Sequence, residues 1–549
     1  MESSVPAACG RKRRQRAWRP KSRTGCTTCK IRRIKCDETR PSCDKCTSTG
    51  RKCDGYTTSP ATHSDTSTTE LSTRDAPIHQ PLHEFLALQF LFESKDERES
   101  FDFFRTKATT EFGGFFASPF WQREVLQAVG SQAGLRYGVI ALGAMHRRYS
   151  SGTSSSLPDD ASDKLLRFAL VQSNRAIRET LNQLNGAKSQ ADMITLMTSC
   201  VLFANMACLQ GHQKDALKHV RSGLNLLQDP EREIRQKSTT SASKDHPVSM
   251  KSLEDVFRNL EIQARGIMSS ADLESWGPKP TNPIDVGVES FSSLDHARQY
   301  FEALYGNLLG FLQDLEFQSP PDLERVRAQF QDIQNHFKAG NRMLADMSRR
   351  IKTPTDPLAR CCINFLGLLR SEMEYFIHHF LCRPSMSFLN ATGPSSAFDE
   401  GRHFSLMMDM VFQIIEYSPS KPKVGLPTFS SNLGLVPPLF LVAKRGPDLR
   451  LRKKAIDVLL AHPRRESVWD GTQAGLIARE AMTIELANMR KELKEQNSDL
   501  DEDTVSIPDH LKISSIGIHY TGTRSAKVEF RTETMFMKNE LGWARNMTW

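Results

Sequence analysis

The sequence predicts a small zinc-stabilised cluster module followed by a large, mostly all-α helical domain. Six cysteines lie within 28 residues near the N-terminus, in a segment too short to fold on an apolar core alone. The 549-residue chain is 39% hydrophobic and 25% charged, as is usual for a globular protein. Beyond about residue 83 its apolar residues recur mainly at helical spacing, which favours helices over strands.

The cysteine segment consists of one half-motif used twice. Its spacing is C-x2-C-x6-C-x6-C-x2-C-x6-C, formed by Cys26, Cys29, Cys36, Cys43, Cys46 and Cys53. Structural zinc takes four ligands in a tetrahedron. Two C-x2-C pairs could hold one zinc ion, but that would leave the third cysteine of each half unexplained. Two ions need eight ligand positions, and six sulfurs fill them only if two bridge, by symmetry the first of each half, Cys26 and Cys43.

A disulfide framework is the alternative reading of these cysteines. It would require an oxidising compartment, and the N-terminus has no apolar stretch behind its charges to serve as a secretory signal. The sequence therefore favours thiolates that bind zinc. With every ligand position filled by sulfur, such a cluster has no place for an activated water and is expected to be structural.

The segments CTTCKIRRIKC and CDKCTSTGRKC resemble the binuclear zinc cluster of fungal transcription factors. Pro41 lies where that family places a turn proline. The resemblance implies one zinc ion on the first four cysteines in chain order. It implies a second ion on Cys26 and Cys43 together with the last two. We therefore expect a cluster domain over residues 26–53 with two structural Zn²⁺ ions as cofactors.

Positive charge is concentrated around the cysteines. Residues 11–52 hold 16 Lys and Arg against three acids, a balance of +13 in a chain whose net charge is +9. A compact cationic module on a near-neutral body is the electrostatic pattern of a nucleic-acid binder. Residues 1–25 are expected to form a basic disordered arm that binds phosphates or directs nuclear import. A merely solvated tail is the alternative.

The loop after the second cysteine carries the residues expected to contact DNA. Ile31 and Ile34 are predicted to pack a short helix against the metal core and to leave the cations pointing outward. In the resembling family this helix enters the major groove, where the positions of Arg32 and Arg33 contact a short C/G-rich triplet. Arginine suits this role because its guanidinium can bond guanine O6 and N7 together. The expected DNA-binding set is Lys30, Arg32, Arg33, Lys35, Lys45, Arg51, Lys52, Arg19, Lys21 and Arg23.

Not all of these residues are expected to read bases. Lys45, Arg51 and Lys52, and the arm residues Arg19, Lys21 and Arg23, are assigned to phosphates, which position a protein without reading sequence. The family more often has lysine at the position of Arg33, so the preferred half-site could differ in detail. Generic DNA affinity is the alternative, and it would depend steeply on salt while ignoring sequence.

Residues 54–82, rich in Ser and Thr, are expected to form a flexible linker. No heptad pattern follows, so a homodimer, if formed, is not expected to use a coiled coil. Residues 83–549 are expected to form an α-helical regulatory domain that does not enter a membrane. The expected helices are 295–316, 321–350, 357–382, 399–417, 448–461 and 472–495, with a buried helix over 193–211 ended by Gly211.

Three further local patterns in this domain carry predictions. Leu166, Leu170, Ile177, Leu181 and Leu184 recur at helical spacing and predict a helix, with Gly186 after it as a stop. The alternating residues of 516–520 and 526–530 predict a β-hairpin across the sequence TGTRS. The charged and aromatic cluster of 464–470 is interpreted as intradomain structure.

Residues 103–146 and 435–471 also resemble the long regulatory region of fungal zinc-cluster regulators, whose fold is all-α. The resemblance thus extends over most of the chain. No phosphate-binding glycine loop or catalytic constellation accompanies it. The adjacent His378 and His379 would point about 100° apart on a helix, so they cannot both ligate a metal from one face.

These observations together predict a nuclear, sequence-specific DNA-binding regulator of RNA polymerase II transcription, and not an enzyme. Its expected partners are double-stranded DNA and the transcription machinery or co-regulators. The alternative is a zinc-stabilised protein-interaction regulator that does not read DNA sequence.

Overall fold

The computed structural model divides into two compact units, Met1–Gln80 and Pro81–Trp549, which we describe separately. Most of the expected arm and linker lies outside the described residues. The structure describes residues 25–32, 34–54, 91–152, 163–183, 189–228, 246–268, 272–273, 276, 284, 288–317, 322–351, 356–381, 398–418, 426–495 and 506–549.

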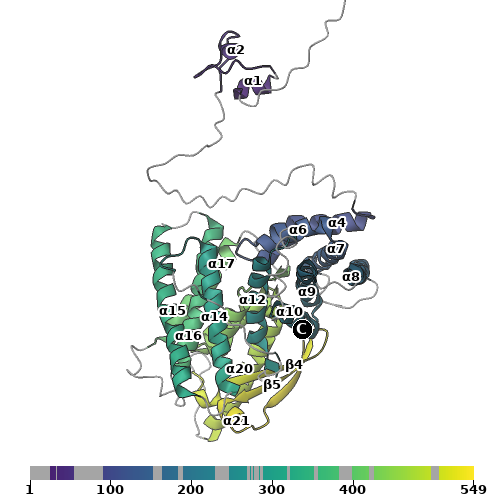
Figure 1. Cartoon of the computed structure of the whole chain (residues 1–549). Helices are drawn as coiled ribbons and strands as arrows, with labels where there is room; N and C mark the ends of the chain where they lie inside the picture. The colour runs from purple at the N-terminus through teal and green to yellow at the C-terminus, as the bar shows by residue number, and fades with distance from the viewer. Residues whose placement is uncertain are drawn as a thin grey trace, which may run out of the picture. The chain divides into compact units, whose positions relative to one another are not determined.

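The second unit is mostly helical, as predicted (Figure 1). Its first part contains α4 (Lys95–Phe103), η1 (Phe104–Ala108), α5 (Thr109–Gly113), η2 (Phe120–Glu124), α6 (Val125–Ser131), α7 (Ala133–Ser150), α8 (Lys164–Gln183), α9 (Gln190–Gln210), α10 (Gln213–Leu227) and α12 (Met250–Ile267). The second part contains α14 (Leu294–Phe317), α15 (Leu323–Arg350), α16 (Pro357–Leu381), α17 (Glu400–Tyr417), α18 (Val436–Arg445), α19 (Leu449–Ala461), α20 (Gly471–Glu495), η6 (Asp509–Leu511) and α21 (Glu533–Met537).

The six helices expected between residues 295 and 495 are all present, with ends within two residues of the predicted positions. Several begin at a side-chain cap, which satisfies backbone N–H groups that have no partner inside the helix. Asp322 caps α15, Asp399 caps α17 and Asp448 caps α19. Figure 1 shows α14, α15 and α16 running side by side, and α14 packs against both of the others.

The central helix α9 is buried, as its apolar composition predicts. It begins with a reciprocal capping box between Ser189 and Asp192. It ends at Gly211, whose φ of 84° is the left-handed conformation that glycine adopts without strain. Among the described helices, α9 is the one with the length and hydropathy to cross a bilayer. However, 72% of its apolar window is buried within the protein, as in a core helix.

The helix predicted from the leucine spacing is confirmed as α8, but most of those large apolar residues do not form its buried face. Leu166 is buried, but Leu170, Ile177 and Leu181 are 42%, 43% and 62% exposed. Leu184 lies outside the described residues. The small side chains of α8 face α7 instead, namely Ala169, Ser173, Ala176 and Thr180.

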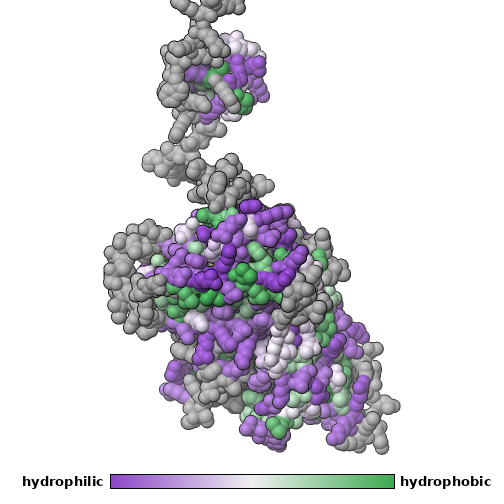
Figure 2. Space-filling model, turned by 90° about the vertical axis from the view of Figure 1, so that its right-hand side faces the viewer, coloured by the Kyte–Doolittle hydropathy of each residue, from purple (hydrophilic) through white to green (hydrophobic). Residues whose placement is uncertain are grey.

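The reason is close helix packing. Gly134 of α7 lies against Thr180, where even a Cβ atom would collide. Small residues on both helices let the two backbones approach closely, and this contact turns the larger apolar residues of α8 toward solvent. Figure 2 views the side of the molecule on which α8 lies, and hydrophobic residues gather in patches there.

Two three-stranded sheets complete the unit. The predicted hairpin is confirmed as β4 (Ile513–Gly522) and β5 (Ser525–Thr532), with Ile518 opposite Val528. A third strand that the sequence did not indicate, β6 (Trp543–Thr548), pairs antiparallel with β5. This sheet packs on α20 through a separate apolar cluster that includes Ile477, Val528 and Phe530.

The second sheet was not predicted. It consists of β1 (Thr428–Ser430), β2 (Arg464–Glu466) and β3 (Trp469–Asp470), and β1 runs parallel to β2. Its strands have two or three residues, too few for period-2 alternation to be recognised.

The charged cluster of residues 464–470 is intradomain structure, as interpreted from the sequence. Arg465 Nε donates to Asp470 Oδ2 at 2.8 Å, and its Nη1 donates to the carbonyl oxygens of Cys208 and Leu209 at the end of α9. The carboxylate of Glu466 accepts the first backbone N–H groups of α18. Buried charges are retained here because each has several partners.

Candidate metal centre and DNA interface

Four cysteine sulfurs form the centre of the N-terminal unit. Cys26 Sγ lies 3.5 Å from Cys43 Sγ and 3.8 Å from Cys46 Sγ, and Cys29 Sγ lies 3.6 and 3.8 Å from the same two atoms. Two sulfurs bound to one tetrahedral zinc ion at about 2.3 Å would be about 3.8 Å apart. The spacing therefore fits zinc–thiolate coordination. The shortest separation joins the two sulfurs expected to bridge.

The remaining two cysteines occupy equivalent places in the two half-motifs. The backbone N–H of Cys26 donates to Cys36 Sγ at 3.4 Å, and that of Cys43 donates to Cys53 Sγ at 3.5 Å. In both halves, therefore, the amide of the first cysteine points at the sulfur of the third. This twofold repetition matches the doubled sequence motif, and it places a third ligand beside each expected bridging residue.

The short helices α1 (Thr27–Ile31) and α2 (Asp44–Thr47) create this geometry. Each starts directly after the first cysteine of its half, and one turn then brings the second cysteine back to the same side. The two cysteines on the helices, Cys29 and Cys46, are buried at 1% and 0% exposure. Repetition of C-x2-C is thus the local reason that four sulfurs converge.

Burial in this core opposes the thiolate form of the cysteines. Burial raises the pKa of the Cys26 thiol to about 12, and it also raises the pKa values of Cys29 and Cys43. A buried thiol stays protonated at neutral pH unless a positive charge compensates the thiolate. Zinc supplies that charge directly, so the donor set fits a structural zinc site. Its binding releases the thiol protons.

Asp37 has a structural role that sequence reasoning missed. Its carboxylate accepts the backbone N–H groups of Asp44 and Lys45 at 2.8 and 3.0 Å and the hydroxyl of Thr39. The hydrogen bond from Thr39 does most to lower the pKa of Asp37, and the bonds from the two backbone N–H groups lower it further. The side chain thus caps α2 from a neighbouring loop and ties the two halves together. A capping acid seven residues before its helix has no local sequence signature.

The predicted packing of Ile31 and Ile34 against the metal core is wrong. Ile31 is 74% exposed and Ile34 is 41% exposed. The described core of this unit consists of the cysteine side chains themselves. A cluster of sulfurs leaves little room for branched side chains, and α1 is too short to present a second apolar face.

The expected DNA-contacting residues fall into three groups. Five of them are solvent-exposed in the described module: Lys30, Lys35, Lys45, Arg51 and Lys52. Arg32 is half-buried, and its Nη1 donates to Lys45 O at 3.3 Å and to Thr49 Oγ1 at 3.2 Å. Arg33, Arg19, Lys21 and Arg23 lie outside the described residues.

The bonds of Arg32 connect the first half-motif to the second. They orient the guanidinium along the module surface instead of into open solvent. Base reading by Arg32 would have to break or share these bonds, whereas its present contacts hold the helix α1 in place.

The two histidines set aside from the sequence pack against aromatic rings of the helical unit. The His378 ring centroid lies 4.3 Å from that of Phe398, and the His379 ring stacks on Tyr375 at 5.5 Å. Packing of this kind gives no indication of a metal site.

Comparison with known proteins assigns the N-terminal module to a class. Residues 24–62 match the family model described as the fungal Zn(2)-Cys(6) binuclear cluster domain. This module is a binuclear zinc cluster, and its cofactors are two structural zinc ions.

Relatives extend the similarity beyond the cluster. The chain is 25% identical to the aspercryptin biosynthesis cluster-specific transcription regulator of Emericella nidulans, over 95% of this chain and 96% of the relative. It is 23% identical to a transcription regulator of Purpureocillium lilacinum, over 36% of this chain and 48% of the relative.

A further relative matches over a short segment. A transcriptional regulatory protein of Schizosaccharomyces pombe is 58% identical over 41 residues, 8% of each chain. No solved structure matches the chain.

Proposed function

We propose that this protein is a nuclear, sequence-specific DNA-binding regulator of RNA polymerase II transcription, and that its zinc cluster reads a short C/G-rich half-site in the major groove. The observation that carries the proposal is the binuclear cluster itself, surrounded by exposed cations. The matched cluster family and the relatives named as transcription regulators support a transcription regulator, not an enzyme.

The DNA contact is assigned by exposure and chemistry. Lys30 and Lys35 are exposed on either side of the end of α1, and Arg33 lies between them in sequence. We assign Arg33 to a base contact because a bidentate arginine–guanine pair discriminates between bases by about 1–3 kcal/mol. We assign Lys45, Arg51, Lys52 and the arm residues Arg19, Lys21 and Arg23 to phosphates.

We assign Arg32 a positioning role because of its hydrogen bonds to the second half-motif. Its bonds to Lys45 and Thr49 hold the end of α1 against the second half-motif. The metal assignment follows the same symmetry. Cys26 and Cys43 bridge, Cys29 and Cys36 complete one site, and Cys46 and Cys53 complete the other.

The large helical unit is proposed to regulate the module and to contact co-regulators or the transcription machinery. Its full-length similarity to a cluster-specific regulator supports control of a gene set by a chain of this organisation. Pairing of two copies on DNA, if it occurs, is proposed to use surfaces other than a coiled coil.

The experiment is selection of DNA from a random library by the full-length, zinc-loaded protein. An enriched C/G-rich motif is expected. Arg33→Ala should lose the base preference, whereas Arg51→Ala should weaken binding to all sequences alike and lower the salt slope by about one.

Two outcomes would contradict the proposal. Stoichiometric zinc without an enriched motif would favour a protein-interaction regulator that does not read DNA. Unchanged selectivity in Arg33→Ala at fixed salt would remove that residue from base reading.

A further inference from the structure

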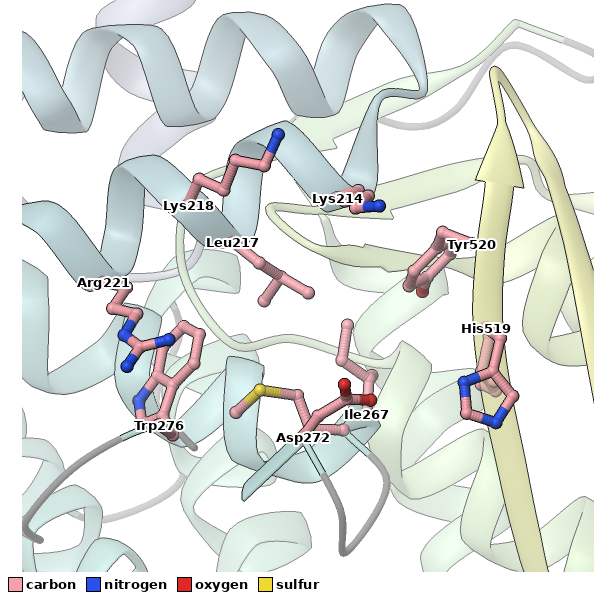
Figure 3. A pocket seen from close by; sticks show the side chains of 11 residues that line it. Lys214, Leu217, Lys218, Arg221, Ile267, Asp272, Trp276, His519 and Tyr520 are labelled. Carbon is pink, nitrogen blue, oxygen red and sulfur yellow. The ribbon is translucent and has the colours of Figure 1, made fainter. Parts of the chain in front are cut away.

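A pocket in the helical unit lies between α10, the end of α12 and strand β4 (Figure 3). Its cavity volume is about 400 Å³, within the size range of small-molecule sites. The lining side chains surround an open centre in Figure 3. They are Lys214, Leu217, Lys218, Arg221, Ile267, Met268, Asp272, Trp276, Ile518, His519 and Tyr520.

One wall of the pocket is cationic. Lys214, Lys218 and Arg221 lie at positions i, i+4 and i+7 of α10, so one helix face carries all three. Lys218 is paired with Asp215 at 2.8 Å. All three cations are exposed, and among the described residues that line this pocket Asp272 supplies the one carboxylate. The mouth therefore carries an excess of positive charge.

The interior of the pocket is apolar. Ile267 and Trp276 are each 8% exposed. A second cavity of about 100 Å³ adjoins the first, because Ile267, Met268, Ile518 and Tyr520 line both. The inner cavity adds the apolar side chains of Phe440, Trp469, Ile477 and Ile516. The two together form a cleft with a cationic mouth and a largely apolar inner cavity, which Lys444, Asp470 and Gln473 also line.

We propose that this cleft binds an amphipathic organic anion, with an apolar tail in the inner cavity and a carboxylate on the cations of α10. A carboxylate can accept charge-assisted hydrogen bonds from Lys214 and Arg221, which are stronger than neutral ones. The tail removes apolar surface from water at Phe440 and Trp469. Neither the zinc cluster nor DNA reading is needed for this binding.

Lys444 adds a polar group at the inner end. Its Nζ donates to the carbonyl oxygen of Ser514 at 2.9 Å, and burial lowers its pKa to about 7. An anion that reached the inner cavity would meet a lysine able to take up a proton. Four cations, Lys214, Lys218, Arg221 and Lys444, line the cleft against the carboxylates of Asp272 and Asp470, so its described lining has an excess of positive charge and favours an anion over a cation.

Binding would also connect elements that are distant in sequence. The cleft is lined from α10, α12, α20 and the C-terminal sheet, so a ligand in it contacts both halves of the helical unit. A ligand that binds one arrangement of these elements better than another shifts the protein toward that arrangement. This gives the helical unit a means of responding to a metabolite.

The test is isothermal titration of the full-length, zinc-loaded protein with octanoate, 1-octanol and octyltrimethylammonium. We expect saturable binding of octanoate with an affinity at least tenfold higher than that of 1-octanol. Octyltrimethylammonium should bind with the lowest affinity of the three. No saturable octanoate binding, or equal affinity for the acid and the alcohol, would overturn the proposal.

Variants locate the binding. Lys214→Gln with Arg221→Gln should weaken octanoate about tenfold and leave octanol unchanged, and Lys453→Gln, at an exposed lysine of α19, is the matched control. Leu217→Trp should fill the cleft and block both ligands. Circular dichroism melting checks that Leu217→Trp folds. If Leu217→Trp does not fold, the double variant still tests the proposal, because both of its substitutions are at the surface. Full octanoate affinity in the double variant would refute the site.

Discussion

Arg465 joins the end of α9 to the small central sheet, and replacing it should destabilise the helical unit strongly. The side chain is 5% exposed and is paired with the equally buried Asp470 at 2.8 Å. It also donates to Cys208 O at 2.9 Å and Leu209 O at 2.8 Å, at the C-terminus of α9. Arg465→Met keeps much of the side-chain volume and removes the charge and all of these bonds.

The size of the expected loss in unfolding free energy follows from the buried charge of Asp470, which the substitution leaves behind. Breaking a buried ion pair by removing one partner costs about 3–5 kcal/mol, because it leaves an uncompensated buried charge. Asp470 would keep its bonds from the backbone N–H groups of Thr472 and Gln473 and from Trp549 Nε1. These bonds compensate part of the charge, so we expect a loss near the lower end of that range, about 3 kcal/mol.

The assay is urea unfolding of the full chain, followed by circular dichroism. Arg178→Met, at an exposed position of α8, is the control and should change the unfolding free energy by less than about 0.5 kcal/mol. Arg465→Met with Asp470→Asn should be less destabilised than Arg465→Met alone, because the uncompensated charge is gone. A loss below about 1 kcal/mol in the single variant, or no recovery in the double variant, would refute the reasoning.

Four other variants test the metal centre and the helical core. Cys26→Ala should lose both zinc ions in native mass spectrometry while Cys53→Ala keeps one, and a single zinc retained in Cys26→Ala would contradict bridging. Burial raises the pKa of Glu372 from 4.5 to about 8, so its contribution to stability is lost as pH rises between these values. Glu372→Gln should remove this pH dependence and raise the free energy of unfolding at pH 7 by up to roughly 3 kcal/mol, at 1.36 kcal/mol per pH unit. An unchanged dependence of the unfolding free energy on pH in this variant would argue against the reasoning. Gly134→Ala places a methyl group against Thr180 and should cost about 1–3 kcal/mol, measured as a lower melting temperature; wild-type stability would show that α7 and α8 can separate without cost.

The zinc cluster was predictable because its information is local. Two ligands three residues apart on one helical turn point to the same side, whatever surrounds them. The doubled half-motif therefore predicted two metals and their structural role. The same sequence did not predict the position of Ile31 and Ile34, because their exposure depends on how much space the sulfurs leave.

Helix positions were predictable for a similar reason. Apolar periodicity and capping residues act within one or two turns, so the ends of α15, α17 and α19 agree closely with expectation. Which face of a helix is buried is a different question. In α8 small residues such as Ala176 and Thr180 are buried while Leu170, Ile177 and Leu181 are exposed. The reason is that Gly134 on α7 allows a close approach that periodicity does not reveal.

By itself, the sequence determined the metal count, the cationic character of the module and the helical class of the body, since each depends on residue type and short-range spacing. Only the tertiary structure decided which groups meet across long separations. It brought Asp37 to the start of α2, Arg465 to the end of α9, and the cations of α10 to the mouth of an apolar cleft beside β4. Such contacts depend on how whole elements pack, and no local pattern encodes them.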